Sequence, residues 1–327
     1  MKILVTGGCG YIGSHMVKIL LEQGMDVVVY DNLSYGHKET VPNNVKLVVG
    51  DLENTEILSS VFENDNIDAV MHFAAYISMA ESVENPKIYF RNNVFNAMNL
   101  FDTMIRFNVK KLIFSSTAGV YGNPIKTPIT EDHPTNPTNP YGESKLMVEK
   151  ILKWYDQAYG LKHIILRYFN AAGASLDGSN GEDHDPETHI IPIAIKTALG
   201  QNGTFEIYGK NYNTKDGTCV RDYIHVVDLA KAHLLSLKSL VKNSKSNIYN
   251  VGTSVSYSNK EVAEMVQKVT GVNFNIEYSN NRPGDAEILV ASCEKIRNEI
   301  GFVPEYSDLE NIIQSAWQWH KNHAGGW

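Results

Sequence analysis

The sequence predicts an α/β protein built on a doubly wound parallel sheet, followed by a smaller mixed α/β domain. In the first half of the chain, short apolar runs rich in Val and Ile alternate with stretches whose apolar residues recur every three or four positions. The apolar runs are nearly continuous, as in strands that helices cover on both faces. After Asn170 this alternation gives way to glycines, prolines and polar residues, where we expect the second domain to begin.

The expected elements follow in chain order. The strands are the runs rich in apolar and β-branched residues: 2–7, 26–31, 45–51, 69–75, 111–117, 162–170 and, as a late addition to the sheet, 247–252. The helices are the stretches with three- and four-residue apolar periodicity: 13–23, 86–107, 141–159, 228–240 and 259–270. We therefore expect a first domain over residues 1–170, to which a segment of about 219–252 returns, and a second domain over residues 171–327.

Composition excludes several classes of protein. The formal net charge is -8, with the acidic residues spread along the chain, which disfavours nucleic-acid binding through a basic patch. The first apolar run is too short for a signal peptide or a membrane span, so we expect a cytoplasmic protein without a membrane partner. Cys9, Cys219 and Cys293 are odd in number and far apart, which predicts reduced thiols and neither a disulfide framework nor a cysteine zinc site.

A glycine-rich turn lies between the first predicted strand and the first predicted helix. Gly7, Gly10 and Gly13 follow the spacing Gly-x-x-Gly-x-x-Gly, and Tyr11 and Ile12 complete the turn. The first glycine allows a tight turn, the second lets a pyrophosphate approach the backbone, and the third lets helix pack on strand while its N-terminus faces the anion. The pattern predicts a dinucleotide site.

Asp31 ends the second predicted strand, where a carboxylate can accept hydrogen bonds from ribose hydroxyls. A 2'-phosphate would be repelled there, and no arginine follows within residues 32–37, so we expect NAD and not NADP. Further cofactor contacts are expected beside Asp31 and at the ends of the third and fourth strands, from Asn32, Asp51, Leu52, Phe73, Ala74 and Ala75.

Tyr141 and Lys145 lie four residues apart at the start of a predicted helix, so they share one helix face. A nearby ammonium favours the phenolate and makes tyrosine a usable general base. One strand–helix unit earlier, Ser115, Ser116 and Thr117 end a strand at the same sheet edge. These residues predict a Ser/Thr–Tyr–Lys catalytic group of Thr117, Tyr141 and Lys145.

The glycine spacing, Asp31 and this catalytic group resemble the extended short-chain dehydrogenase/reductase family, with its NAD-binding Rossmann fold. Four further motifs resemble the UDP-hexose 4-epimerases of that family: Thr6-Gly7-Gly8 with Gly10-Tyr11-Ile12-Gly13-Ser14-His15, Asn92-Asn93-Val94, Arg167-Tyr168-Phe169-Asn170 and Val220-Arg221-Asp222-Tyr223-Ile224-His225. The resemblance implies an isomerase that interconverts UDP-galactose and UDP-glucose through a 4-keto sugar, by transient hydride transfer to tightly bound NAD. It also implies a homodimer.

The resemblance assigns roles residue by residue. Tyr141 takes the proton of the sugar 4-hydroxyl, Thr117 hydrogen-bonds near that hydroxyl, and Lys145 also binds the nicotinamide ribose. The cofactor site gains Asn92, Ser115, Tyr168 and Phe169. Besides Thr117 and Tyr141, the implied substrate contacts are Asn170, His189, Ile190, Glu206, Ile207, Tyr208, Arg221, Tyr223, Arg282 and Asp285.

Leu289 lies where some relatives place a bulky tyrosine against the sugar. A smaller wall there predicts that UDP-N-acetylglucosamine and UDP-N-acetylgalactosamine are also substrates. His184 and His189 flank an acidic loop, but their spacing belongs to no familiar ligand pattern, so no metal is expected.

Three other functions are compatible with an NAD-binding chain of this type. A 4,6-dehydratase is disfavoured because Ala118 and Gly119 stand where that group carries an Asp-Glu pair. A UDP-uronate 4-epimerase, or another NAD-dependent nucleotide-sugar epimerase or decarboxylase, stays open. A non-catalytic NAD-binding scaffold is disfavoured because Tyr141, Lys145 and a hydroxyl partner are all present.

Overall fold

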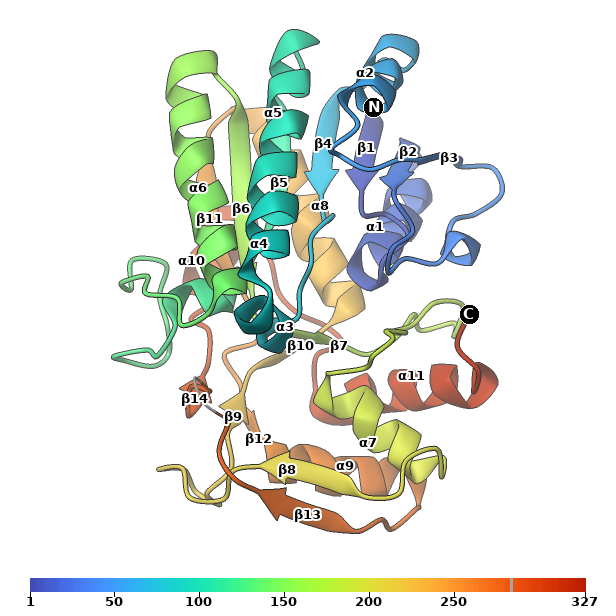
Figure 1. The fold of residues 1–327 in the computed structure, drawn as a ribbon, viewed down its shortest axis with the longest axis vertical. Helices are drawn as coiled ribbons and strands as arrows, with labels where there is room; N and C mark the ends of the chain where they lie inside the picture. Colours follow the sequence, from blue (N-terminus) through green and yellow to red (C-terminus); the bar gives the residue numbers. More distant parts are fainter. Residues whose placement is uncertain (283–284) are drawn as a thin grey trace. The chain divides into compact units, whose positions relative to one another are not determined.

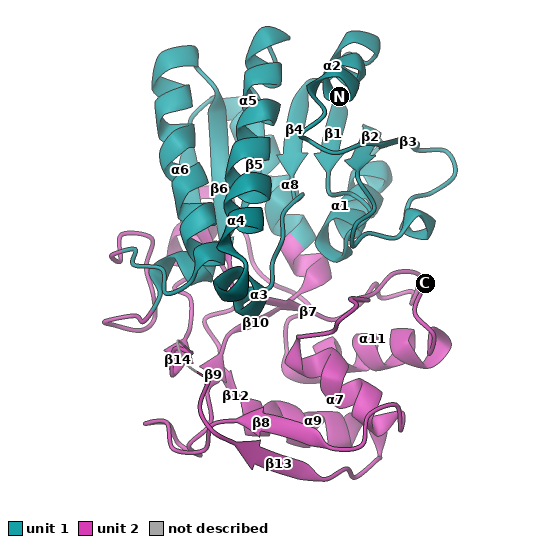
Figure 2. Cartoon of the chain, in the orientation of Figure 1, with its two compact units in different colours: residues 1–122, 135–167, 230–249 teal, residues 123–134, 168–229, 250–327 magenta. Residues whose placement is uncertain are grey.

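The structure is a computed structural model that describes residues 1–282 and 285–327. The chain folds into two compact units, coloured separately in Figure 2. Unit 1 contains residues 1–122, 135–167 and 230–249, and unit 2 contains residues 123–134, 168–229 and 250–327. Apart from residues 123–134, the chain stays in unit 1 up to residue 167, where it passes into unit 2. The later segment that returns to unit 1 is 230–249.

The main sheet has seven strands in the order β11-β6-β5-β4-β1-β2-β3. Strand β1 pairs in parallel with β2 and β4, β2 with β3, and β4 with β5. The strands are β1 (Lys2–Thr6), β2 (Asp26–Asp31), β3 (Lys46–Val49), β4 (Ala69–His72), β5 (Lys111–Thr117), β6 (Lys162–Tyr168) and β11 (Asn247–Val251). The predicted doubly wound α/β fold is confirmed, and strand order reverses between β1 and β4, where such sheets bind ligands.

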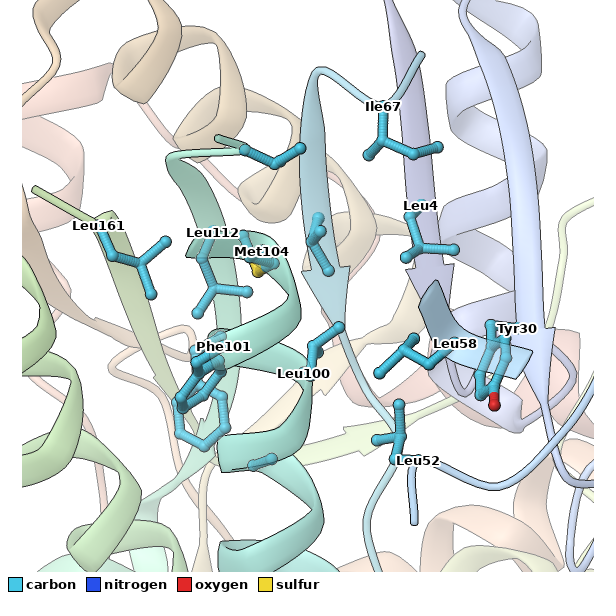
Figure 3. Close-up of a cluster of buried hydrophobic side chains, with 14 of the residues drawn as sticks. Leu4, Tyr30, Leu52, Leu58, Ile67, Leu100, Phe101, Met104, Leu112 and Leu161 are labelled. Atoms are coloured by element: carbon cyan, nitrogen blue, oxygen red, sulfur yellow. The ribbon is translucent and has the colours of Figure 1, made fainter. Parts of the chain in front are cut away.

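Helices cover both faces of this sheet (Figure 1). They are α1 (Tyr11–Glu22), α2 (Thr55–Asn64), α3 (Met79–Glu84), α4 (Pro86–Tyr89), α5 (Asn96–Arg106), α6 (Pro140–Tyr159) and α8 (Val226–Asn243), with short turns of other helix types at η1 (Lys38–Thr40), η2 (Phe90–Phe95) and η3 (Ala118–Tyr121). Helices α2, α5 and α6 pack apolar side chains against the strands in one buried cluster, part of which Figure 3 draws. The buried side chains of α1 do not belong to that cluster, because this helix lies on the other face of the sheet.

Two predictions within unit 1 are wrong in detail. Residues 86–107 were expected to form one α-helix, but a π-helical segment, η2, separates α4 from α5. The fourth strand was expected to include Phe73, Ala74 and Ala75, but β4 ends at His72. The amides of Phe73 and Ala74 both bond to the carbonyl oxygen of Thr6, at 2.8 and 3.1 Å, so the chain turns out of the strand there.

Unit 2 has its own core, in which α7, α9 and α11 pack with short strands. Its elements are β7 (Asn170–Ala172), α7 (Ile190–Ala198), β8 (Phe205–Tyr208), β9 (Val220–Arg221), β10 (Tyr223–His225), β12 (Tyr257–Ser258), α9 (Asn259–Thr270), β13 (Ile276–Ser279), β14 (Ile288–Leu289), α10 (Glu294–Ile300) and α11 (Leu309–Asn322). The strands form three small sheets, β10-β7, β12-β9-β14 and β13-β8.

Among the described residues, no helix is long and apolar enough to cross a membrane. Cys9, Cys219 and Cys293 are buried and form no disulfide, as the sequence predicts.

Candidate active site

The glycine turn joins β1 to α1 and fits a dinucleotide. Gly7 has a φ of +73°, and a Cβ atom on it would lie 2.5 Å from the backbone nitrogen of Ala74. A Cβ atom on Gly13 would lie 2.0 Å from the carbonyl oxygen of Gly7. At Gly10, by contrast, it would meet only that same oxygen, at 3.5 Å. Packing therefore requires glycine at Gly7 and Gly13, whereas Gly10 leaves open the space that a ligand needs beside the helix N-terminus.

Asp31 lies at the end of β2 and is buried. Its carboxylate accepts hydrogen bonds from the backbone N–H groups of Cys9 and Leu33, both at 2.9 Å. Burial raises the pKa of Asp31, and these backbone bonds act in the opposite direction. The Cys9 thiol also hydrogen-bonds this carboxylate. A carboxylate has four acceptor positions, so the side chain both holds the glycine turn and can still accept from a ribose hydroxyl.

The neighbouring strand end carries a second polar group. Asp51 accepts hydrogen bonds from the side-chain amides of Asn32 at 2.7 Å and Asn96 at 3.1 Å. Leu52 is buried in the core of unit 1. Of these predicted cofactor residues, Asn32 and Asp51 are therefore in contact with each other, whereas Leu52 packs in the apolar core.

A buried asparagine that the sequence analysis did not assign fixes the segment after β4. Asn93, in η2, accepts from the amide of Tyr76 at 2.9 Å and donates to the Tyr76 carbonyl at 3.0 Å and to the Ser144 hydroxyl at 3.1 Å. The predicted contact, Asn92, donates to the Asn93 side chain at 3.1 Å. Asn93 thus ties Tyr76, the residue after the predicted cofactor contacts Phe73, Ala74 and Ala75, to helix α6. The adjacent Asn-Asn dipeptide is the sequence signal for this link.

Tyr141 is the second residue of α6, whose N-terminus is capped by the Asn139 side chain accepting from the amide of Gly142 at 2.9 Å. The phenol is 8% exposed. Burial raises the pKa of Tyr141 to about 12, and a hydrogen bond from the Thr117 hydroxyl lowers it. Thr117, the last residue of β5, also accepts from the amide of Gly119 at 3.0 Å. The hydroxyl groups of Thr117 and Tyr141 are therefore paired.

Lys145 lies one turn further along α6 and is 3% exposed. Its Nζ donates to the carbonyl oxygen of Ser115 at 2.9 Å and lies 5.1 Å from the centre of the Phe114 ring. Burial lowers the pKa of Lys145 to about 7, and the negative charge of Glu149 opposes that shift. The ammonium and the phenol are therefore both held on the helix face that meets the end of β5.

A buried ion pair supports the same strand end. Arg167 donates to Glu149 from Nε at 3.0 Å and from Nη2 at 2.5 Å, and from Nη1 to the Tyr121 hydroxyl at 3.0 Å. The Ser116 hydroxyl donates to Glu149 at 2.5 Å. The sequence analysis did not assign Glu149, although it stands four residues after Lys145 on the same helix, and this spacing was the available signal.

Unit 2 holds the arginine of the Val220–His225 motif. Arg221 donates from Nη1 to the carbonyl oxygens of Val220 at 3.0 Å and Ala286 at 2.8 Å, and its Nη2 lies 4.0 Å from Asp285. Its neighbour Asp222 does not form a surface ion pair with it. Instead Asp222 is fully buried and accepts four backbone or hydroxyl hydrogen bonds, for example from the amide of Thr253 at 2.8 Å, and burial raises its pKa to about 6.

The other predicted substrate residues of unit 2 separate into exposed and buried groups. The guanidinium of Arg282 stacks on the Tyr208 ring with its carbon 3.6 Å from the ring centre. Glu206 is exposed on the same strand, β8, and accepts from the Ser279 hydroxyl. The side chains of Ile207 and Tyr223 belong to the apolar core of unit 2. Contacts to a polar ligand are thus available from the first three side chains, while the last two pack the strands that carry them.

The remaining predicted residues lie at element ends. Asn170 begins β7 and donates from its side chain to the Asp222 carbonyl at 3.0 Å. Leu289 on β14 pairs in parallel register with Arg221 on β9, so the two side chains share one face of that sheet. Phe169 is buried, and its amide bonds to the Val251 carbonyl at 3.1 Å, directly after Tyr168 ends β6.

His189 and Ile190 mark the start of α7. The His189 side chain lies in a cluster with Glu182, His184 and Glu187, whose ligand-type atoms are all within 4.8 Å of one another. The histidine spacing alone predicts no metal. The structure adds Glu182 and Glu187, two oxygen donors that this spacing does not include.

The model of the NAD dependent epimerase/dehydratase family matches residues 3–252. The chain belongs to this family. The match confirms the resemblance that the motifs indicated and confirms NAD as the cofactor of this epimerase/dehydratase chain.

Similar proteins of this family match the chain over nearly its whole length. The UDP-glucose 4-epimerase of Lactobacillus helveticus is 50% identical over 327 residues, covering 100% of this chain and 99% of that protein. The crystal structure of UDP-glucose 4-epimerase from Brucella ovis in complex with NAD is 44% identical, covers 97% of each chain and has a TM-score of 0.93. The UDP-Glc/GlcNAc 4-epimerase from Campylobacter jejuni is 42% identical, covers 98% of this chain and 99% of that chain, and has a TM-score of 0.86.

Proposed function

We propose that the protein interconverts UDP-galactose and UDP-glucose by inverting carbon 4 of the hexose. One observation carries this proposal: the buried phenol of Tyr141 is hydrogen-bonded to Thr117, and Lys145 lies one helical turn further along the same helix. The chain is also 50% identical to a UDP-glucose 4-epimerase. When bound, NAD supplies the oxidising and reducing equivalents for carbon 4.

Tyr141 accepts the proton of the 4-hydroxyl and returns it when the hydroxyl is restored. Burial alone penalises a phenolate here and an ammonium at Lys145, as their shifted pKa values indicate. When both groups are charged, each offsets part of the other's penalty, so Lys145 favours the basic form of Tyr141. Thr117 donates a hydrogen bond to the phenol oxygen and orients the sugar hydroxyl beside it.

The UDP portion requires cationic donors. Arg221 and Arg282 meet this requirement because a guanidinium has five N–H groups, more than these two side chains use in the contacts described above. Asn170 and Tyr208 add side-chain polar groups. In unit 1, the glycine turn, Asp31 and Asp51 bind the cofactor's pyrophosphate and ribose.

We also propose that N-acetylated UDP-hexoses are substrates. Leu289 shares a sheet face with Arg221, so a leucine there leaves room beside a diphosphate ligand that a tyrosine would fill. The similarity to the Campylobacter jejuni enzyme, which is named for both UDP-Glc and GlcNAc, supports this proposal.

The protein is further expected to form a homodimer in the cytoplasm, and sedimentation equilibrium of the purified chain tests the dimer directly.

Proton NMR tests the function. The purified protein is incubated with UDP-galactose and no added NAD, and the anomeric signals are followed until they are constant. We expect a stable mixture of UDP-galactose and UDP-glucose, because the cofactor is regenerated in each turnover. No conversion even after NAD is added, together with turnover of a UDP-uronate, would contradict the proposal in favour of a uronate 4-epimerase.

A further inference from the structure

Two histidines and two glutamates meet in the loop that connects β7 to α7 in unit 2. In the sequence they form two Glu-x-His pairs, Glu182/His184 and Glu187/His189. Their ligand-type atoms all lie within 4.8 Å of one another. None of the four side chains takes part in the catalytic group of Tyr141, so the cluster needs its own explanation.

The distances within the cluster match a small coordination shell. Glu182 Oε1 lies 2.7 Å from Nδ1 of His189 and 3.4 Å from Nδ1 of His184. Glu187 lies 3.6 Å from His184 through Oε2 and 3.5 Å from His189 through Oε1. Ligands at the distances typical of zinc, about 2.0–2.1 Å from the ion, are separated by roughly 3.3 Å in a tetrahedron.

Contacts within the cluster satisfy its buried carboxylates only in part. Glu187 Oε2 is buried and lies 3.6 Å from His184 Nδ1, beyond hydrogen-bond distance, and the 2.7 Å contact of Glu182 Oε1 with His189 Nδ1 is favourable only while that nitrogen carries a proton. The side chain of Glu182 is 4% exposed and that of Glu187 is 6% exposed. Buried carboxylate oxygens without donors are costly, and a cation between them would remove that cost.

Backbone groups hold one of these carboxylates in position. Glu187 Oε1 accepts from the amides of Thr188 at 2.7 Å and His189 at 2.8 Å. The remaining oxygen, Oε2, is the one directed to His184. Such outer hydrogen bonds orient carboxylate ligands in metal sites.

We propose that Glu182, His184, Glu187 and His189 bind one divalent metal ion of the zinc class. Two imidazole nitrogens and two carboxylate oxygens form a tetrahedral N₂O₂ set, and the two negative charges balance the ion. Because all four positions are filled by protein ligands, the site is structural and leaves no position for a substrate or water. His189 is the N-cap residue of α7. The ion would therefore join the β7–α7 loop to the start of that helix.

The full chain is produced in cells grown with added zinc and is purified by gel filtration. Its metal content is then measured by mass spectrometry. We expect about one zinc ion per chain, as in other closed sites. Replacement of zinc by Co²⁺ should give the intense visible absorption of tetrahedral cobalt, which requires no variant and no turnover. A strong chelator should lower the unfolding temperature of the wild type.

Variants assign the ion to these residues. H184Q and E182Q should lose the ion and the response of the unfolding temperature to the chelator. D185N is the matched control, because Asp185 is exposed in the same loop and its carboxylate lies outside the cluster, and it should keep both. If H184Q does not fold, the wild-type cobalt spectrum and chelator response still decide.

Two results would overturn the proposal. A wild-type chain that holds no metal and whose unfolding temperature is unchanged by the chelator would show that the four side chains share protons as a His/Glu ion-pair cluster. Equal metal content in the wild type and H184Q would show binding elsewhere. Neither result depends on epimerase activity, so the two proposals can fail separately.

Discussion

Lys145 donates a hydrogen bond from Nζ to the carbonyl oxygen of Ser115 at 2.9 Å, which ties the first turns of α6 to the end of β5. Thr117 follows two residues after Ser115 on that strand, and Tyr141 precedes Lys145 by one helical turn. The bond therefore holds the strand end that carries Thr117 beside the helix turn that carries Tyr141. The proposed chemistry depends on this alignment.

Replacing Tyr141 by Phe removes the proton acceptor and leaves the ring. We expect kcat to fall by ~10²- to 10⁴-fold with a small change in KM, because general-base catalysis contributes about that much. Steady-state kinetics with UDP-galactose measure the effect. Tyr159→Phe, at the exposed end of the same helix, is the control and should keep wild-type kinetics. Equal kcat in the wild type and Tyr141→Phe would exclude Tyr141 as the base.

Thr117 can be tested with two variants of opposite expectation. Thr117→Val keeps the shape and loses the hydroxyl that bonds to the phenol, so kcat should fall by ~10- to 100-fold, the value of one hydrogen bond to a charged group. Thr117→Ser keeps the hydroxyl and should retain most of the activity. A serine variant as impaired as the valine variant would mean that the methyl group, and not the hydroxyl, is required.

The pH dependence of stability reports on Lys145. Burial lowers its pKa from 10.5 to about 7, so between these values the unfolded chain binds a proton that the folded chain has lost. The free energy of unfolding should therefore rise with pH over this window, by up to about 1.4 kcal/mol per pH unit. Below about pH 7 both states are protonated and the contribution is constant.

Lys145→Met isolates this contribution. Denaturant unfolding of NAD-free wild type and variant is compared from neutral to alkaline pH. We expect the difference in unfolding free energy, wild type minus variant, to increase with pH, because methionine has no proton to lose. Parallel curves would contradict the assigned environment of Lys145.

The buried pair of Glu149 and Arg167 should be important for stability. Each residue is 5% exposed, so Glu149→Gln leaves a guanidinium buried without its charge partner, at a cost of ~3–5 kcal/mol. The control is Glu63→Gln, which breaks an exposed ion pair with Arg106 and should cost at most about 1 kcal/mol. Denaturant titration measures both. Similar losses for the two variants would mean that burial does not distinguish these pairs.

Leu289→Tyr tests the size of the sugar site. A bulkier side chain on the face shared with Arg221 should lower kcat/KM for UDP-N-acetylglucosamine by about tenfold or more, and for UDP-glucose by less than about threefold. Kinetics with both sugars give the ratio. An unchanged ratio, or a wild type inactive on the acetylated sugar, would show that Leu289 does not set specificity.

The parts of the fold that a periodic pattern encodes were predictable. The strands of the main sheet carry continuous β-branched runs, and α6 carries both its apolar stripe and its Asn139-Pro140 start signal. The π-helical segment η2 was not predictable, because one extra residue per turn does not disturb an apolar pattern enough to be seen. Its effect is to bury Asn93, which then binds both Tyr76 and Ser144.

The candidate site was predictable where a residue's neighbours lie on the same element or at the same sheet edge. Thr117, Tyr141 and Lys145 are of this kind. The Glu182–His189 cluster is different, because its four side chains come from a loop, where sequence spacing does not determine direction. The burial of Tyr223 in the core of unit 2 could not be read from its motif for another reason: strand β10 has only three residues, all buried, so it shows no alternating pattern.

The proposed reaction oxidises and reduces carbon 4 on one protein molecule, without exchange of the carbon-4 hydrogen with solvent. UDP-galactose labelled with deuterium at carbon 4 is converted in ordinary water, and the product is analysed by NMR and mass spectrometry. We expect UDP-glucose that keeps the deuterium at carbon 4, because the hydrogen removed is the hydrogen returned. UDP-glucose without the label would contradict the return of the same hydrogen to carbon 4. No UDP-glucose at all would contradict the proposed 4-epimerase activity.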